Sequence, residues 1–208
     1  MKKWLCVLLA LALSLGLCLA SAEARELPAY SYPFAEENPL TAAVVDCMMR
    51  TGMGFEPDPG GVMIPAPVVI RTEMNGDETE ATVYGNFWIF GYRLKGKILE
   101  MTCGGENPGV MRLEKKDGKW AVTSFETAPE DGNPSESLRR FAGGDEVLEM
   151  EYRIAGDAAS GYLPQYRRSF IAEYVKANHL DIEAYQDYGW DPVPLPEEST
   201  DSYYSILD

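Results

Sequence analysis

One stretch of the chain, residues 83–99 (VYGNFWIFGYRLKGKIL), is apolar or aromatic on both faces of the β-strand that its pattern predicts. Successive side chains of a strand point to opposite faces. The first face carries Val83, Phe87 and Ile89. The second face carries four aromatic residues: Tyr84, Trp88, Phe90 and Tyr92. The apolar side chains of both faces must be shielded from water. The aromatic face can be covered by the protein itself, by a ligand or by a partner.

A helix is predicted before this strand. Asn38 is a typical N-cap, Pro39 is a typical first helical residue, and Gly52 can end the helix after about three turns. The residues between them predict an amphipathic helix, because one stripe recurs at helical spacing. The members of this stripe are Leu40, Val44, Cys47, Met48 and Thr51.

Antiparallel strands are predicted after the helix. A strand over residues 67–74 leads through the hairpin turn Asn75-Gly76 into a return strand over residues 78–92. The return strand is long, so we expect a bend or bulge near Gly85 or Gly91. A third strand within residues 94–103 and a second hairpin about Asp117-Gly118 bring the total to four or five strands.

The last third of the chain is predicted to be helical. A short helix is expected over residues 135–141, and Asp181 can cap another short helix that runs through Tyr185. Between them lies a longer helix with a broad apolar stripe. The residues of that stripe are Leu163, Tyr166, Phe170, Ile171, Tyr174 and Val175.

These elements predict an α+β fold. The N-terminal helix is expected to pack on a bent four- to five-stranded antiparallel sheet, with a C-terminal helical extension packed on the same sheet. The chain divides as follows: residues 1–22, a signal peptide; 23–37, an irregular lead-in; 38–132, the sheet domain; 133–189, the helical extension; 190–208, an acidic, proline-rich tail. The first helix can cover one face of the two-faced strand. The C-terminal helix is the expected cover of the aromatic face, and an open sheet that holds a ligand or a partner remains the alternative.

The N-terminus predicts export. Lys2 and Lys3 form a basic region, an apolar run covers residues 4–20, and Ala20-Ser21-Ala22 is a typical cleavage site. We therefore expect a secreted or extracytoplasmic protein, with an uncleaved anchor as the alternative. No later run is long enough to span a bilayer, so no membrane span is expected after cleavage.

Charge narrows the class of partners. The formal net charge is −15, and it becomes −17 when the two lysines of the signal are removed. Such a chain repels nucleic acid and anionic lipid surfaces, so neither is expected as a partner. Solubility is the simplest role of this charge, and cation binding is the functional alternative.

Two cysteines remain after cleavage, Cys47 and Cys103. In an exported protein they can form a disulfide, yet both lie in apolar contexts that are typical of free buried thiols, so both interpretations stay open. With His179 as the single histidine, the chain offers no zinc site, and we expect no metal and no cofactor.

The order of elements resembles the cystatin/NTF2-like architecture, a helix followed by a bent antiparallel sheet that closes with the hairpin KKDGKWAV. Residues 83–141 are also similar to secreted domains of Gram-positive gut bacteria, some of which form the extracellular part of membrane proteins of the beta-lactam sensor-transducer metallopeptidase type. The zinc-binding H-E-x-x-H helix and the acyl-accepting Ser-x-x-Lys motif of such proteins are both absent from this sequence. The resemblance therefore implies a domain at the cell envelope, without protease activity or covalent drug sensing.

The sequence shows no strong motif of a catalytic site. His179 is expected at the end of the C-terminal helix, where it interacts with the helix dipole, and no G-x-S-x-G motif presents a serine. The paired acids Glu78 and Glu80 lie beside a turn, and nothing singles them out for acid–base chemistry. We name no catalytic residue and expect a non-catalytic binding or sensory module of the envelope.

The unknown small ligand of such a module, or an envelope protein, would lie against the aromatic face, which carries Tyr84, Trp88, Phe90 and Tyr92. The alternatives are a carboxylate-dependent hydrolase of cell-wall or dietary polymers and a docking module for a membrane partner.

Overall fold

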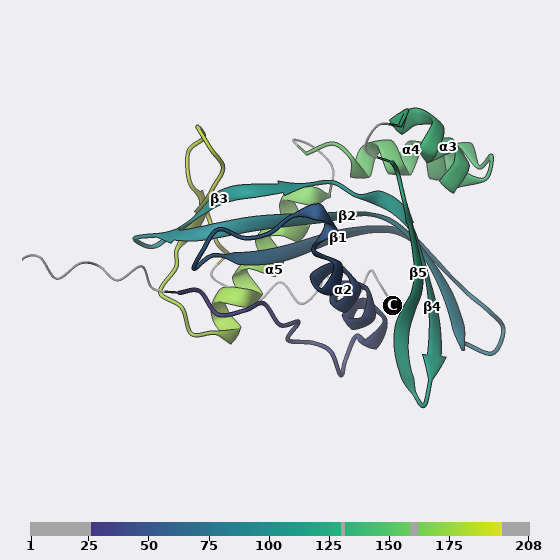
Figure 1. Ribbon diagram of the computed structural model, residues 1–208, viewed down its shortest axis with the longest axis horizontal. Helices are drawn as coiled ribbons and strands as arrows, with labels where there is room; N and C mark the ends of the chain where they lie inside the picture. The colour runs from purple at the N-terminus through teal and green to yellow at the C-terminus, as the bar shows by residue number, and fades with distance from the viewer. Residues whose placement is uncertain (1–25, 130–131, 159–161, 197–208) are drawn as a thin grey trace, which may run out of the picture.

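The computed structural model describes residues 26–129, 132–158 and 162–196. The predicted signal peptide, residues 130–131 and 159–161, and the last twelve residues of the chain lie outside the described residues. The fold is α+β, as predicted: one helix packs against a seven-stranded sheet, and further helices follow in the C-terminal part (Figure 1).

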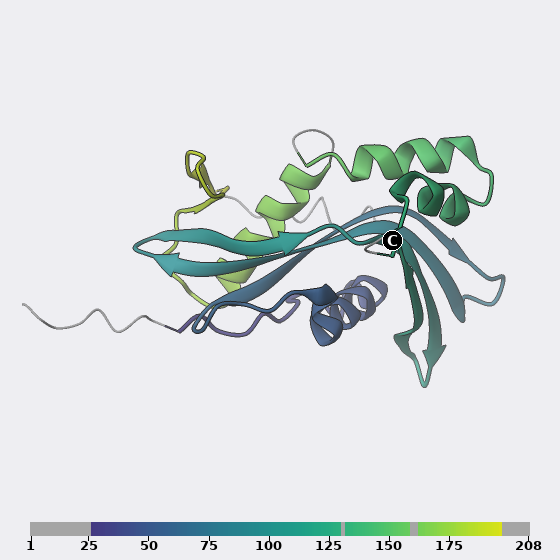
Figure 2. The ribbon, with the colours of Figure 1, turned by 45° about the horizontal axis from the view of Figure 1, so that its top comes forward.

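The first half of the chain forms the elements α2 (Pro39–Thr51), η2 (Gly52–Gly54), β1 (Val62–Met74), β2 (Glu80–Lys95), β3 (Ile98–Gly105), β4 (Pro108–Lys116) and β5 (Lys119–Thr127). The second half forms α3 (Pro134–Ala142), α4 (Glu146–Ala155), α5 (Leu163–Ala177), β6 (Ala184–Gln186) and β7 (Val193–Pro194). Helix α2 lies on one face of the sheet, and α3, α4 and α5 lie on the other (Figure 2).

The long strand β2 organises the sheet. One edge of β2 pairs with β1, while the other edge pairs first with β4, over 80–86, and then with β3, over 89–95. The sheet bends where these two partners diverge (Figure 2). The register shifts between Gly91 and Tyr92, where the sequence predicted a bulge. Glycine suits this position, because a Cβ atom on Gly91 would lie 2.5 Å from the sulfur of Cys103 and force that side chain to move.

Strand β1 starts five residues earlier than the sequence predicted, at Val62 instead of residue 67. Pro65 and Pro67 cannot donate backbone hydrogen bonds, so both are unusual inside a strand. The structure accommodates both prolines because β1 is an edge strand, so one side of its backbone needs no partner strand.

Both faces of β2 are covered by the protein. Val83, Phe87 and Ile89 pack with Leu40, Val44 and other residues of the α2 stripe. On the opposite face, Trp88, Phe90 and Tyr92 pack with the α5 stripe, which includes Tyr166 and Phe170. The sequence favoured the C-terminal helix of the protein itself as the cover of the aromatic face, and the structure shows this packing.

The C-terminal part differs from the prediction in two places. The short helix expected from Asp181 to Tyr185 is wrong: the segment contains the start of β6, which pairs in parallel with β3. Tyr185 is buried there beside Leu99, so burial against the sheet decides the conformation. Helix α4, which the sequence analysis did not predict, lies between the two helices that it did predict.

Candidate functional site

The aromatic residues predicted as a ligand-binding face do not form an open surface. Trp88, Phe90 and Tyr92 are buried, and Arg167 of α5 lies over the rings of Phe90 and Tyr92. Its guanidinium carbon is 4.0 Å from the centre of the Phe90 ring, and its Nε donates a hydrogen bond of 2.7 Å to the Tyr92 hydroxyl. A ligand would have to displace α5 to reach these three rings.

Tyr84 lies apart from the other three aromatic residues. It packs at the edge of the small cluster formed by α3, α4 and Val110, and its hydroxyl donates to Glu73 Oε2 over 3.2 Å. The indole nitrogen of Trp88 donates to the backbone oxygen of Ala155, at the end of α4. The structure thus gives these aromatic residues contacts with the helices that cover the sheet.

The two cysteines are free thiols in the structure. Cys47 is buried on the inner stripe of α2, and its burial raises the pKa of the thiol. Cys103 lies on β3 and contacts the backbone oxygen of Glu56 at 3.3 Å. Both pack in or against the same core cluster.

The remaining polar candidates lie at turns and helix ends. His179 is exposed and follows α5 in a left-handed conformation, and its backbone N–H donates to Lys176. Glu78 and Glu80 are exposed beside the β1–β2 turn. Within the described ranges, no group of three acids, cysteines or histidines comes together to hold a metal ion, and no helix is long and apolar enough to cross a membrane.

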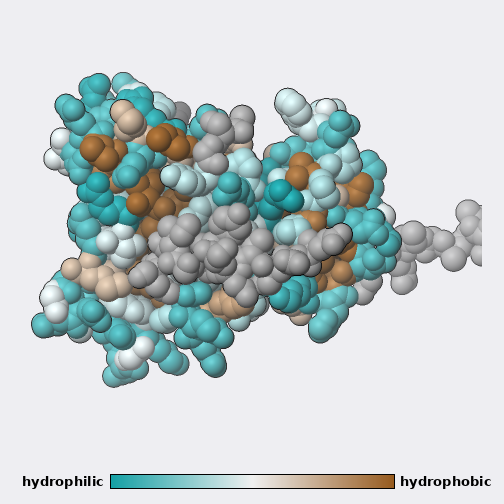
Figure 3. Space-filling model, turned by 180° about the vertical axis from the view of Figure 1, so that it is seen from behind, coloured by the Kyte–Doolittle hydropathy of each residue, from teal (hydrophilic) through white to brown (hydrophobic). Residues whose placement is uncertain are grey.

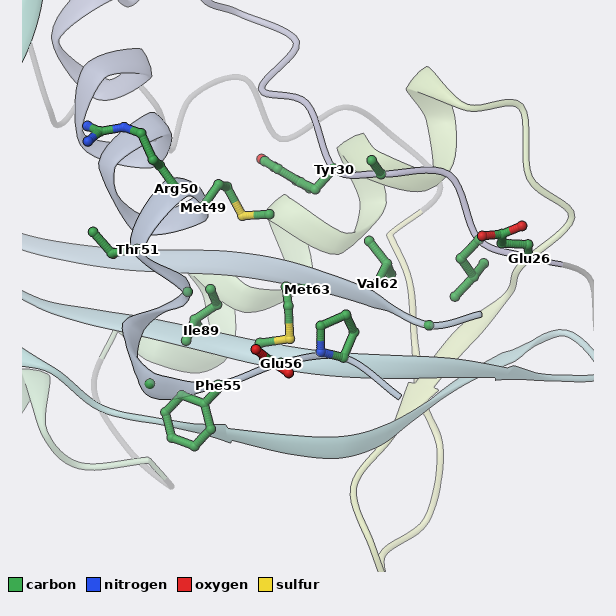
Figure 4. Close-up of a pocket in the computed structure, with 16 residues that line it drawn as sticks. Glu26, Tyr30, Met49, Arg50, Thr51, Phe55, Glu56, Val62, Met63 and Ile89 are labelled. Atoms are coloured by element: carbon green, nitrogen blue, oxygen red, sulfur yellow. The ribbon is translucent and has the colours of Figure 1, made fainter. Parts of the chain in front are cut away.

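A wide groove lies between the N-terminal segment, the end of α2 and the start of β1 (Figure 4). Its volume is about 930 Å³, which is within the range of small-molecule sites. Apolar side chains form much of its lining, and those labelled in Figure 4 are Met49, Phe55, Val62, Met63 and Ile89. The polar lining includes Glu26, Tyr30, Arg50, Thr51 and Glu56.

The groove exists because the chain turns sharply after α2. Gly52, Met53 and Gly54 adopt φ angles of 65°, 50° and 82°, so three left-handed residues follow one another. Such a conformation is unfavourable for methionine, and the burial of the Met53 side chain in the core holds it in place. On the other side, the N–H of Leu27 donates to Gly60 over 3.0 Å and fixes the N-terminal segment beside β1.

Tyr30 is the polar group of greatest interest in this groove. It lines the wall, only 9% of it is exposed, and its ring stacks on Tyr174 of α5 at a centroid distance of 6.1 Å. Burial raises the pKa of its hydroxyl, and the nearby Tyr32 and Glu173 raise it further, so the group is neutral. In the part of the chain that the structure describes, this hydroxyl has no hydrogen-bond partner. A buried hydroxyl without a partner costs about 1–3 kcal/mol. The oxygen of Tyr30 is closed to solvent, so a ligand in the groove would bond to it, and recover this cost, after a movement of the groove wall.

Charges at the groove are mixed. Arg50 lies at the edge of the groove with its guanidinium turned away from the cavity (Figure 4), and its Nε lies 3.5 Å from Asp46 on the exposed side of α2. Glu26 and Glu56 supply two negative charges. The lining therefore offers an apolar floor, charges of both signs and one buried hydroxyl.

No protein-family model matches the chain, and no curated protein matches its sequence. The function is therefore inferred from the geometry of the molecule itself. Sequence reasoning missed the groove, because Tyr30 falls in a segment predicted only as irregular. The Gly-Met-Gly turn followed by the loop FEPDPGG was the one local signal of a break in packing at this place.

Proposed function

We propose that the protein is an exported, non-catalytic binding module of the cell envelope and that its ligand lies in the groove beside Tyr30. The signal-like N-terminus supports export. Among the described residues the hydroxyl of Tyr30 has no hydrogen-bond partner, and this buried group in the wall of the groove is the observation that carries the proposal. A functional polar group in a pocket fixes the orientation of a ligand whose apolar part contributes most of the contact area.

The lining favours an amphipathic small molecule. Its apolar body would lie on Met49, Met63 and Ile89, and a hydrogen-bonding group would meet Tyr30. Methionine side chains are flexible and polarisable, so they adapt to ligands of more than one shape. A charged end of the ligand would lie near Arg50 or Glu56 at the mouth.

A thermal-shift screen tests the proposal. The probes are single-chain amphiphiles with neutral, acidic and basic head groups, muropeptides, beta-lactams and, as purely polar molecules, oligosaccharides. A ligand at roughly 100 times its dissociation constant stabilises the fold by about 2.7 kcal/mol, which raises Tm by about 5–10 °C for a chain of this size. An unchanged Tm with every amphipathic probe, for a protein that is well folded without a probe, contradicts the proposal.

Two variants assign a hit to the groove. Tyr30→Phe keeps the ring stack and removes only the hydroxyl, so we expect a roughly 3- to 10-fold loss of affinity with no loss of stability. Tyr188→Phe makes the same chemical change on an exposed loop and serves as the matched control. Equal affinity of the two variants would place the ligand elsewhere.

A further inference from the structure

Helix α4 is apolar on two sides. Its inner side packs on the sheet through Leu148, Tyr152 and Ala155, and the Tyr152 hydroxyl donates to Gly109 over 2.7 Å. Its outer side carries Val147, Met150 and Ile154, which are 64%, 63% and 43% exposed. A surface helix is normally polar on the side that faces water, so the outer side is unusual.

The apolar surface continues beyond α4. Ile154 borders a groove of about 250 Å³ that runs between α4, the start of α5 and β1. Tyr162, which is 58% exposed, and Tyr166 line the α5 side, and Val69 and Ile70 line the β1 side. In Figure 3 hydrophobic residues gather on the upper left, at the end of the molecule where α4 lies. We call Val147, Met150, Ile154 and Tyr162 the α4 outer face.

Acidic residues surround this face. Asp145, Glu146, Glu149 and Glu151 lie on α4 or at its N-cap, against the single basic residue Arg153. Much of this charge is neutralised. Arg71 lies 2.9 Å from Asp145 and 3.8 Å from Glu151, and Glu149 lies 2.7 Å from Arg153 and 3.7 Å from Arg139. The four acids still outnumber the three arginines that pair with them, and the whole chain carries a formal charge of −15, so a basic partner is favoured over an acidic one.

The charge selects among occupants. A second copy of this chain would bring a second acidic rim against the first, and anionic lipid would be repelled for the same reason. Membrane-surface helices are rich in Lys and Arg on their polar side, whereas α4 carries Arg153 alone. A partner whose apolar residues are flanked by basic ones fits both the exposed side chains and the rim.

We propose that the α4 outer face docks a basic amphipathic helix of a partner protein. Apolar anchors of that helix cover Met150 and Ile154 and reach into the groove beside Tyr162. Its lysine or arginine residues face Glu146 and Glu151. This is recognition of an amphipathic helix by an apolar groove, with charge setting the choice of partner.

The test uses a model peptide, a leucine–lysine amphipathic helix of roughly 18 residues with a fluorescent label. Its affinity for the protein is measured by fluorescence anisotropy. A leucine–glutamate peptide with the same apolar face reports on charge. The variant V147T/M150Q/I154Q removes the apolar outer face, and Met74→Gln, at another exposed apolar residue, is the matched control.

We expect the leucine–lysine peptide to bind the wild type and the Met74→Gln variant alike, with a loss of roughly tenfold or more in the triple variant. Binding should weaken as salt rises, and the leucine–glutamate peptide should bind at least tenfold more weakly. A circular-dichroism spectrum like that of the wild type excludes misfolding of the triple variant.

Four results would overturn the proposal. If the leucine–lysine peptide bound the wild type and the triple variant equally, it would be held elsewhere by charge alone. If both peptides bound the wild type equally, the acidic residues around the face would not select the partner. A dimer in sedimentation that the triple variant abolishes would make a second copy the occupant. A large gain in peptide affinity on deletion of residues 197–208 would make this segment the occupant.

Discussion

Strand β2 and helix α4 present the same problem with two different outcomes. Both are apolar on two sides. For β2 the chain supplies both covers, α2 on one face and α5 on the other. For α4 it covers the inner side only, and Met150 remains 63% exposed on the outer side. A two-sided apolar pattern therefore shows that an element needs two covers, without showing where the second one comes from.

The position of each element in the fold explains the difference. β2 lies at the centre of the sheet, with partner strands on both edges, and α2 before it and α5 after it in the sequence pack onto its two faces. Helix α4 packs at the bent end of the sheet beside α3 (Figure 1). The described part of the chain places α5 further along the sheet, where it covers Phe90 and Tyr92.

Truncation of Trp88 is the strongest test of the covered side. Its ring stacks on Phe90 at a centroid distance of 5.8 Å, and its nitrogen donates to Ala155 over 3.0 Å. Trp88→Ala removes this packing and leaves a cavity between β2 and the helices, so we expect the free energy of unfolding to fall by about 3–5 kcal/mol. Denaturant unfolding, followed by circular dichroism, measures the loss. Full stability with loss of ligand binding would instead make the aromatic face the binding site.

Removal of the Arg167 charge should have the next largest effect. The guanidinium is buried over Phe90 and Tyr185, and its Nη1 lies 2.9 Å from Asp187. Arg167→Met keeps much of the apolar contact but leaves the Tyr92 hydroxyl buried without its donor, so we expect a loss of about 2–3 kcal/mol. Asp187→Asn should cost less, because Asp187 is partly exposed. Equal losses of unfolding free energy in Arg167→Met and Asp187→Asn would contradict the larger role given to the buried contacts of Arg167.

The N-cap of α4 makes stability depend on pH. The hydrogen bond from Arg71 lowers the pKa of Asp145, and the backbone N–H groups of Leu148 and Val147 lower it further. A lowered pKa stabilises the folded state above the ordinary pKa of aspartate, and this contribution is lost as the pH falls through the folded value. Asp145→Asn should therefore be less stable than the wild type at neutral pH.

The difference between Asp145→Asn and the wild type should disappear in acid. Unfolding of both proteins is measured at intervals from about pH 7 to about pH 2.5, across the titration range of aspartate. Asn retains a side-chain oxygen that can cap a helix, so the comparison isolates the charge. A difference that stays constant over this range would show that the charge of Asp145 is not its cause.

The sequence predicted elements whose patterns are local. The α2 stripe, the hairpins at Asn75-Gly76 and Asp117-Gly118, and the long helix α5 were all predicted, because caps, turns and periodicity lie within a few residues of one another. The start of β1 and the strand β6 were not, because an edge position and a distant partner strand decide them.

The candidate groove could not be predicted from the sequence because, like β6, it depends on contacts between segments that are distant in the chain. Tyr30 and Met63 are far apart in sequence, and the lining joins the N-terminal segment, α2 and β1. The four aromatic residues of β2 were predicted as a ligand-binding face because they are close in sequence, yet three of them pack against α5. Local aromatic density is thus a better guide to the core of this fold than to its site.

The smallest expected effect belongs to the uncovered side of α4. Met150→Gln should change the free energy of unfolding by no more than about 0.5 kcal/mol, because the side chain lies mostly in water in the folded state as well as in the unfolded one. Leu148→Ala, two residues away on the inner side, should cost about 2–5 kcal/mol. Both are measured by denaturant unfolding of the protein alone. A loss above about 1 kcal/mol in Met150→Gln would mean that the isolated chain already covers this side chain, and α4 would then be no different from β2.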